Sequence, residues 1–199
     1  MTHYFKNPEN LAHNRKEITF RFLGIYVTLT VDDGVFSKSK PDDGSLYLIE
    51  EVLKHKPQGS VLDLGSGVGL MSILLKQHAP DCSVKGFEVN PRALQCAIES
   101  AQKLKLEIEF EEKDVTKGFE GTYDWILTNP PIRAGKAVVY TFFKEASKHL
   151  AHHGKFVVVI RRQQGAASAF KELETLFNDV ERLDLRKGYE ILMAQNPLT

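Results

Sequence analysis

The sequence of 199 residues has little cysteine, no excess of either charge and no long apolar run. Its two cysteines, Cys82 and Cys96, form no pattern typical of a metal site or a disulfide framework, which favours reduced thiols in the cytoplasm. Lysine and arginine number 26 and aspartate and glutamate number 26, so no overall field draws the protein to nucleic acid. The apolar runs are too short to span a membrane, and the polar residues 1–15 do not resemble a signal peptide. We therefore expect a cytoplasmic protein without a membrane partner.

The histidines also lack the companions that a metal site needs. His149, His152 and His153 cluster at the predicted end of a helix before Gly154, where cations are favourable, and no cysteine or acidic residue completes a ligand set. We expect no bound metal. The length, the hydrophobic content of 42% and the charged content of 26% indicate a single globular domain over 1–199, with the oligomeric state open between monomer and homodimer.

The most informative stretch is Val-Leu-Asp-Leu-Gly-Ser-Gly-Val-Gly at positions 61–69. The apolar residues before the glycines are typical of a buried parallel strand, and residues 70–75 are typical of a helix with a buried face. The glycines Gly65, Gly67 and Gly69 lie between the two elements, where a missing Cβ lets the backbone approach a ligand closely. A tight turn without a ligand is the alternative interpretation.

Two later features favour a nucleotide site. Residues 83–88 form a second predicted strand that ends in Glu88, which would lie beside the glycine turn and accept from ribose hydroxyls. Asn129-Pro130-Pro131-Ile132 comes just after the apolar residues 125–127 of a predicted strand. A dinucleotide-binding dehydrogenase would use a similar turn and acid, but position 70 is Leu where that fingerprint requires Gly, and nicotinamide chemistry gives no reason for Asn-Pro-Pro.

Along the chain, the patterns predict an N-terminal β-hairpin at 18–31, a capped amphipathic helix from Asp42 and then alternating strands and helices. Residues 1–58 would hold the hairpin and this helix, and residues 59–199 the cofactor-binding core. Residues 35–41 are interpreted as an exposed loop, and helices are predicted at 138–150 and 166–177. A fifth strand is expected at 156–160, before closing strands at 180–183 and 189–193. Such alternation indicates an α/β fold with a parallel sheet and right-handed crossovers.

These motifs together resemble the class I S-adenosylmethionine-dependent methyltransferases that methylate a planar nitrogen. The resemblance rests on residues 63–69, Glu88, Asp114 and the Asn-Pro-Pro-Ile motif, and it covers 20–195. Residues 33–37, 42–45 and 129–136 more narrowly resemble the small single-domain relatives of the 16S ribosomal RNA guanine-N2 methyltransferases. The resemblance implies a Rossmann-like seven-stranded, mostly parallel sheet with a C-terminal antiparallel hairpin.

The resemblance also implies roles for the cofactor-binding residues. Gly65, Gly67 and Gly69 would line the methionine end of S-adenosylmethionine, and Glu88 would bind its ribose. Asp63 would engage the amino-acid end, although it could instead brace the loop. Asp114 would accept from the adenine amino group, or cap the turn at 114–116, or do both.

Asn129, Pro130 and Pro131 are the predicted catalytic residues. An exocyclic amine is a poor nucleophile because its lone pair is delocalised, so two acceptors on its N–H groups would hold it and favour positive charge on nitrogen. The Asn129 side-chain oxygen and the Pro130 carbonyl are the candidate acceptors, the latter free because Pro131 has no N–H. Alignment and preorganised electrostatics would then supply most of the catalysis.

The substrate side is less well defined by the sequence. Ile132 stands where related amino-methyltransferases carry an aromatic residue, so Phe36 is the candidate to stack on the target base, and Arg133 and Lys136 are candidates for phosphate contacts. Guanine N2 of ribosomal RNA, presented in a ribosomal particle, is the expected acceptor. Adenine N6, a protein glutamine, or a non-catalytic module that only binds the cofactor are the alternatives.

Overall fold

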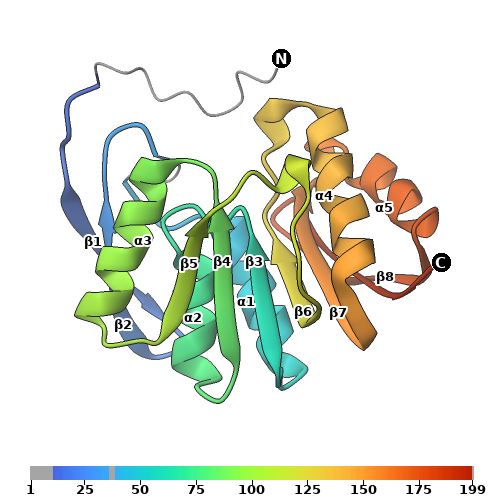
Figure 1. Ribbon diagram of the computed structural model, residues 1–199, viewed down its shortest axis with the longest axis horizontal. Coiled ribbons are helices and arrows are strands. Elements are labelled where there is room, and N and C mark those ends of the chain that lie inside the picture. Colours follow the sequence, from blue (N-terminus) through green and yellow to red (C-terminus); the bar gives the residue numbers. More distant parts are fainter. Residues whose placement is uncertain (1–10, 36–38, 199) are drawn as a thin grey trace.

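A seven-stranded sheet forms the centre of the molecule, in the order β5-β4-β3-β6-β7-β9-β8 (Figure 1). The computed structural model describes residues 11–35 and 39–198. The strands of the sheet are β3 (Ser60–Leu64), β4 (Ser83–Glu88), β5 (Ile108–Glu112), β6 (Tyr123–Thr128), β7 (Leu150–Arg161), β8 (Phe177–Arg186) and β9 (Tyr189–Pro197). β3 to β7 pair in parallel, whereas β9 pairs antiparallel with β7 and with β8. The predicted mostly parallel sheet with a closing antiparallel hairpin is confirmed.

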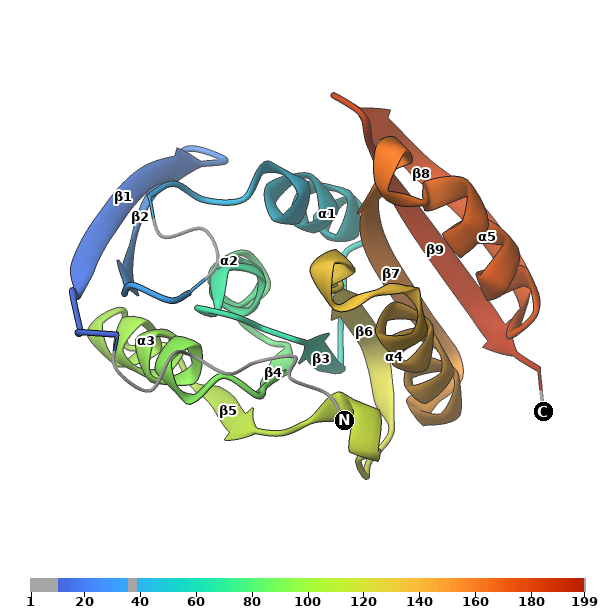
Figure 2. The same cartoon turned by 90° about the horizontal axis from the view of Figure 1, so that it is seen from above.

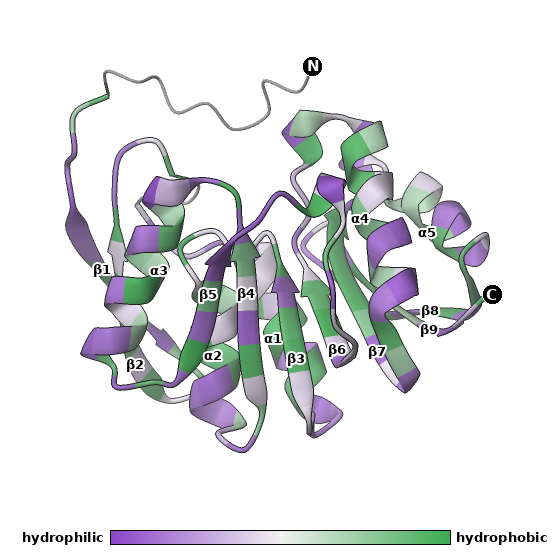
Figure 3. Cartoon of the chain, viewed as in Figure 1, coloured by the Kyte–Doolittle hydropathy of each residue, from purple (hydrophilic) through white to green (hydrophobic). Residues whose placement is uncertain are grey.

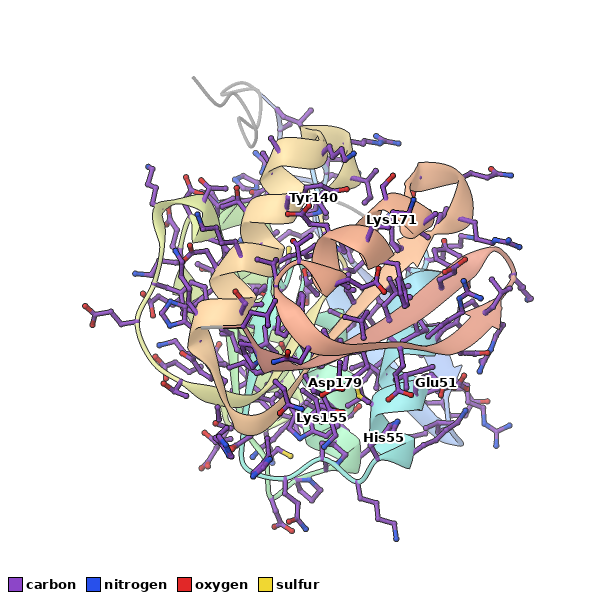
Figure 4. All side chains as sticks on the ribbon, turned by 90° about the vertical axis from the view of Figure 1, so that its right-hand side faces the viewer. Glu51, His55, Tyr140, Lys155, Lys171 and Asp179 are labelled. Atoms are coloured by element: carbon purple, nitrogen blue, oxygen red, sulfur yellow. The ribbon has the colours of Figure 1, made fainter. Side chains whose placement is uncertain are left out.

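Helices cover both faces of this sheet (Figure 2). α1 (Asp43–Lys54), α2 (Leu70–His78) and α3 (Pro91–Lys103) lie on one face, and α4 (Lys136–His149) and α5 (Ala166–Glu174) lie on the other. Figure 4 looks at the β8–β9 end of the molecule, where Tyr140 and Lys171 lie on the opposite side of the hairpin from Glu51 and His55. The architecture is therefore a three-layer α/β sandwich.

The core explains why the central strands are apolar without interruption. In β7, Phe156, Val158 and Ile160 pack toward α4 and α5, while Val157 and Val159 pack with α1 and α2 on the other face. All five are at most 4% exposed. Apolar residues accordingly concentrate in the inner strands and polar residues on the outer sides of the helices (Figure 3). A strand buried on both faces cannot alternate apolar and polar residues.

The N-terminal hairpin is a separate two-stranded sheet of β1 (Lys16–Phe22) and β2 (Ile25–Val31) that packs against α3. Its turn falls at Leu23 and Gly24, as the alternation of side chains predicts. The expectation of an exposed loop at 35–41 was wrong for Val35, which is buried against Val68 and Ala93.

Several predicted boundaries differ from those observed. α5 ends at Glu174 rather than at 177, because Phe177 begins β8 and is buried from a strand. β7 begins at Leu150, so His152 and His153 belong to this strand and not to the end of a helix. None of the helices in residues 11–35 and 39–198 is both long and apolar enough to cross a membrane.

Candidate active site

The predicted cofactor-binding and catalytic residues gather at the carboxyl ends of the parallel strands. The order of the sheet reverses between β3 and β6, because the chain runs outward from β3 to β5 and then returns to pair β6 with β3. Ligands of open α/β sheets bind at such a switch point. The glycine turn follows β3, and Asn129 follows β6. The Thr128 hydroxyl donates to the Leu64 carbonyl (2.8 Å) and joins these two strand ends.

The three glycines of the turn all have positive φ, at +74° for Gly65, +56° for Gly67 and +84° for Gly69. Their surroundings differ. A Cβ at Gly69 would lie 2.9 Å from that of Ala97, so this glycine allows α3 to pack closely. A Cβ at Gly67 would meet no atom within 4 Å, so this glycine faces open space. Gly67 is therefore the position at which a ligand can approach the backbone.

Glu88 lies directly beside this turn. Its Oε2 accepts from the Gly67 amide (2.7 Å) and its Oε1 from the Asn90 amide (2.8 Å). Burial raises the pKa of the Glu88 carboxyl, although these two bonds favour its charged form. A carboxylate has lone pairs beyond those used here, so Glu88 orders the turn and can still accept from a bound hydroxyl.

Asp63 lies below the turn, inside the core, and is 1% exposed. Its Oδ2 accepts from the Ser72 hydroxyl on α2 (2.7 Å), so it joins β3 to α2 across the glycine turn. Its buried Oδ1 has no hydrogen-bond partner within the described residues. Burial, with a contribution from the nearby Glu88, raises the pKa of Asp63 to about 7. A buried acceptor without a partner is expensive, so a donor that reached Oδ1 would relieve that cost.

Asp114 follows β5 at the same edge of the sheet. Its Oδ1 accepts from the Thr116 amide (3.0 Å) and hydroxyl (2.6 Å), so it caps the short 3₁₀ turn Val115–Lys117. The capping interpretation is confirmed, and contact with adenine stays a prediction.

Asn129 is the polar residue that leaves β6. Its Nδ2 donates to Asp42 Oδ2 (2.8 Å) and to Ser45 Oγ (2.9 Å) at the start of α1. Both amide protons therefore point into the protein, and Oδ1 is the atom left for another molecule. Pro131 O accepts from the Ala134 amide (3.0 Å), whereas no donor to the Pro130 carbonyl exists within residues 11–35 and 39–198.

The predicted substrate-side residues lie directly after this turn. Ile132 is half-buried against the core, in the 3₁₀ turn Ile132–Ala134. Arg133 and Lys136 are exposed, with Lys136 Nζ 5.1 Å from the centre of the Tyr140 ring. Phe36 lies outside the described residues. The described part of the chain contains no group of three or more metal-ligating side chains.

Sequence patterns did not identify three partners in this site. In the sequence, residues 42–45 indicate a helix start and contribute to the family resemblance, and Ser72 is one residue of a helical face, but none of these patterns indicates a contact with Asn129 or Asp63. Asp42 is 87 residues from Asn129, and no spacing rule connects positions that far apart. The available signals are that Asp42 and Ser45 are polar residues at a helix start and that 42–45 belongs to the stretches that carry the family resemblance.

This set of groups fits S-adenosylmethionine. That molecule requires close backbone approach at its methionine end, an anion for its ammonium and an acceptor for its ribose diol. The open space at Gly67, the unpartnered Oδ1 of Asp63 and the carboxylate of Glu88 meet these requirements in turn.

Comparison with known proteins identifies the family. The family model for the methyltransferase small domain matches residues 26–193. An uncharacterized protein of Bacillus subtilis, YbxB, is 35% identical over 97% of this chain and 98% of its own length. Ribosomal RNA small subunit methyltransferase C of Haemophilus influenzae is 30% identical over 82% of this chain, which spans 49% of that enzyme.

A solved structure is similar to this chain over almost its whole length. The T. Thermophilus 16S rRNA N2 G1207 methyltransferase (RsmC), in complex with AdoMet and guanosine, has a TM-score of 0.83 at 27% identity, over 96% of this chain and 53% of that one. The chain thus spans about half the length of the RsmC relatives that it matches. From the glycine turn, its flanking carboxylates and these similarities, we conclude that the chain belongs to the methyltransferase small domain family and is an S-adenosylmethionine-dependent methyltransferase of class I fold.

Proposed function

We propose that the protein methylates an exocyclic amino nitrogen, and that this nitrogen is N2 of guanine in ribosomal RNA. The observation that carries the proposal is the orientation of Asn129, whose two amide protons are bound to α1. Its Oδ1 is then an acceptor for one N–H of an amine, and the Pro130 carbonyl is an acceptor for the other. The similarity to RsmC enzymes supports ribosomal RNA as the substrate class.

Bound S-adenosylmethionine supplies a methyl group on a sulfonium, which needs no further activation. In the proposal, Gly65, Gly67 and Gly69 accommodate its methionine end, and Asp63 Oδ1 binds its ammonium. Glu88 accepts from the ribose hydroxyls and Asp114 from the adenine amine. The two acceptors after β6 stabilise the positive charge that grows on the target nitrogen, and no strong base is required.

On the substrate side, Ile132 gives apolar contact to the base, and Arg133 and Lys136 bind phosphates. Phe36 covers the base in this proposal. A ribosomal particle is the proposed partner, because the chain has equal numbers of acidic and basic residues and thus no net positive charge for capturing a free strand.

Replacing Asn129 by alanine tests the catalytic role. Asn129→Ala should lower methyl transfer to ribosomal RNA about a hundredfold or more, the scale expected when one preorganised transition-state partner is removed. Affinity for S-adenosylmethionine, measured by titration calorimetry, should not change. Asn178→Ala, at an exposed asparagine of β8, is the matched control. Unchanged turnover with lost cofactor affinity would refute the assigned role.

The identity of the acceptor is tested separately. Mass spectrometry of nucleosides from a deletion strain should show loss of N2-methylguanosine in small-subunit RNA. Loss of N6-methyladenosine from the same nucleosides would instead support adenine as the acceptor. Loss of methylglutamine, seen by mass spectrometry of peptides from the same strain, would support a protein acceptor.

A further inference from the structure

The start of α1 contacts the turn that follows β6 through side chains alone. Asn129 Nδ2 donates one proton to Asp42 Oδ2 (2.8 Å) and one to Ser45 Oγ (2.9 Å). Ser45 is buried and Asp42 is half-buried. Residues 42 and 129 belong to different segments of the fold, and nothing in the glycine turn or the cofactor-binding groups accounts for this contact.

The chemistry of Asp42 determines which end of the amide faces α1. An ionised carboxylate can only accept hydrogen bonds, whereas a serine hydroxyl can donate or accept. If the Asn129 amide were rotated by half a turn, its oxygen would face the Asp42 oxygen and no proton would lie between them. Asp42 therefore excludes that arrangement, and Ser45 alone would not.

We propose that Asp42 is a positioning residue for methyl transfer, which keeps Oδ1 of Asn129 directed toward the substrate amine. The inference rests on the proposed acceptor role of Asn129. The hydrogen bond to a charged group also polarises the amide, which makes Oδ1 a stronger acceptor for an N–H that becomes more acidic in the transition state.

The surroundings of Asp42 keep it in place for this task. Its Oδ2 also accepts from the Ser45 amide (2.7 Å) and so caps α1. Gly44, which lies in the sequence between Asp42 and Ser45, has no room for a side chain. A Cβ there would lie 2.7 Å from the Tyr189 ring and 3.2 Å from Asp42 Oδ2. Tyr189 is buried, and its hydroxyl accepts from Arg161 Nη2 (2.6 Å). The Ser45 amide thus holds the carboxylate at the helix start, and Gly44 lets that start lie directly against Tyr189 of β9.

Asp42→Asn separates the positioning role from the capping role. Asparagine caps helices about as well as aspartate, so α1 and the thermal midpoint should be retained. Its side-chain oxygen can take the place of Oδ2 and keep the cap, but the amide is neutral, so it holds and polarises the Asn129 amide less strongly than the carboxylate does. We expect kcat for methyl transfer to ribosomal RNA to fall about tenfold to a hundredfold, the range expected for misplacing a reacting group, with cofactor affinity unchanged.

Asp43→Asn is the matched control. It makes the same chemical change at the next residue of the same helix, but Asp43 is exposed and no hydrogen bond joins it to Asn129 in the described part of the chain. Its kcat should equal that of the unmodified protein. An equal fall in both variants would show that the charge of the helix start matters rather than the contact, and it would overturn the proposal.

A double-mutant cycle then tests whether Asp42 acts through Asn129. In an Asn129→Ala background, Asp42→Asn should have no further effect on kcat. Additive losses would overturn the positioning role. Full activity of Asn129→Ala would instead refute the proposed function, which distinguishes the two failures.

A structural measurement completes the test without an activity assay. The side-chain amide signals of Asn129 in a ¹⁵N–¹H correlation spectrum, assigned by their loss in Asn129→Ala, should shift and broaden in Asp42→Asn but not in Asp43→Asn. Unchanged signals in Asp42→Asn would contradict the proposal.

Discussion

Asp63 combines full burial with an incomplete set of hydrogen bonds. Ser72 binds one of its oxygens, and the other has no partner within the described residues. Desolvation, assisted by the negative charge of Glu88, raises its pKa from 3.8 to about 7. Near neutral pH the residue is therefore divided between its neutral and charged forms, which is unusual for an aspartate.

This shift predicts a pH dependence of stability. A carboxyl whose pKa is higher in the folded than in the unfolded state binds more protons when folded, so its contribution is full below pH 3.8 and is lost as the pH rises through about 7. Asp63→Asn cannot ionise. The stability of the unmodified protein relative to this variant should fall by about 2 to 4 kcal/mol between pH 4 and pH 8.

Urea unfolding of both proteins across that range measures the difference. Asp43→Asn, at an exposed carboxyl, is the control and should give a nearly constant difference. If the stability of the unmodified protein relative to Asp63→Asn instead stayed constant or rose from pH 4 to pH 8, Asp63 would be charged in the folded protein throughout that range.

Individual site residues could be predicted where the motif that marks them lies within a short stretch of sequence. A glycine turn after a strand and an acid at the end of the next strand lie within 61–88, so Gly67 and Glu88 could be placed together. The partners of Asn129 could not be predicted, because they depend on how α1 packs across β7 and β9. Ser72 was hidden for a similar reason, since its hydroxyl points inward from a helix that is otherwise apolar on that face.

Arg92 links the segments on either side of the N-terminal hairpin to α3, and Asp32 joins those two segments to each other. Arg92 on α3 donates to the carbonyls of Leu11 (2.7 Å), Ala12 (3.2 Å) and Asp33 (3.1 Å). Asp32 accepts from His13 Nδ1 (2.6 Å) and the Asn14 amide (2.7 Å). Burial acts to raise the pKa of Asp32, but these bonds outweigh it and hold the pKa at about 2.

Removing the donors of Arg92 should therefore loosen the hairpin. Arg92→Met keeps the length of the side chain but leaves three carbonyls without this partner. We expect faster amide hydrogen exchange over residues 11–33, with unchanged exchange in β3 and β6, when followed by mass spectrometry. Arg21→Met, at an exposed arginine on β1, is the control. Unchanged protection at 11–33 would mean that the other contacts between the hairpin and α3, such as Lys103 with Glu17, hold the hairpin without Arg92.

Element boundaries were predictable where a residue type enforces them. Pro91 at the first helical position and the cap at Asn90 fix the start of α3. The end of α5 has no such marker. Leu176 and Phe177 continue the helical spacing, but Leu176 lies in the turn before β8 and Phe177 packs into the core from the start of β8. Periodicity alone cannot distinguish these two ways of burying the same residues.

The whole molecule carries no net charge, which bears on how it would meet RNA. Arg133 and Lys136 are exposed beside the acceptor turn, and such a small basic surface neutralises few phosphates. If the substrate is a preformed particle, small ribosomal subunits or their assembly intermediates should be methylated much faster than protein-free RNA or short oligonucleotides. Methyl incorporation into the three substrates, measured side by side, tests this, and equal efficiency on a short oligonucleotide would refute it.

Charge reversal supplies the control within the same assay. Lys136→Glu should weaken substrate binding and reduce its salt dependence, with cofactor binding unchanged. Lys144→Glu makes the same change on the same helix, about 12 Å farther along its axis, and should behave like the unmodified protein.

The contact between α1 and the turn after β6 also has a consequence for the time at which the enzyme becomes competent. Asn129 and Asp42 are 87 residues apart, so closing this contact costs more chain entropy than the local pairing of β3 with β4. A growing polypeptide that ends at β5 already contains the glycine turn and Glu88 but lacks the turn that receives the methyl acceptor. Under the proposed roles, the chain can transfer a methyl group only after β6 and the turn that follows it have joined the sheet. An incomplete chain that binds the cofactor would therefore not methylate other molecules.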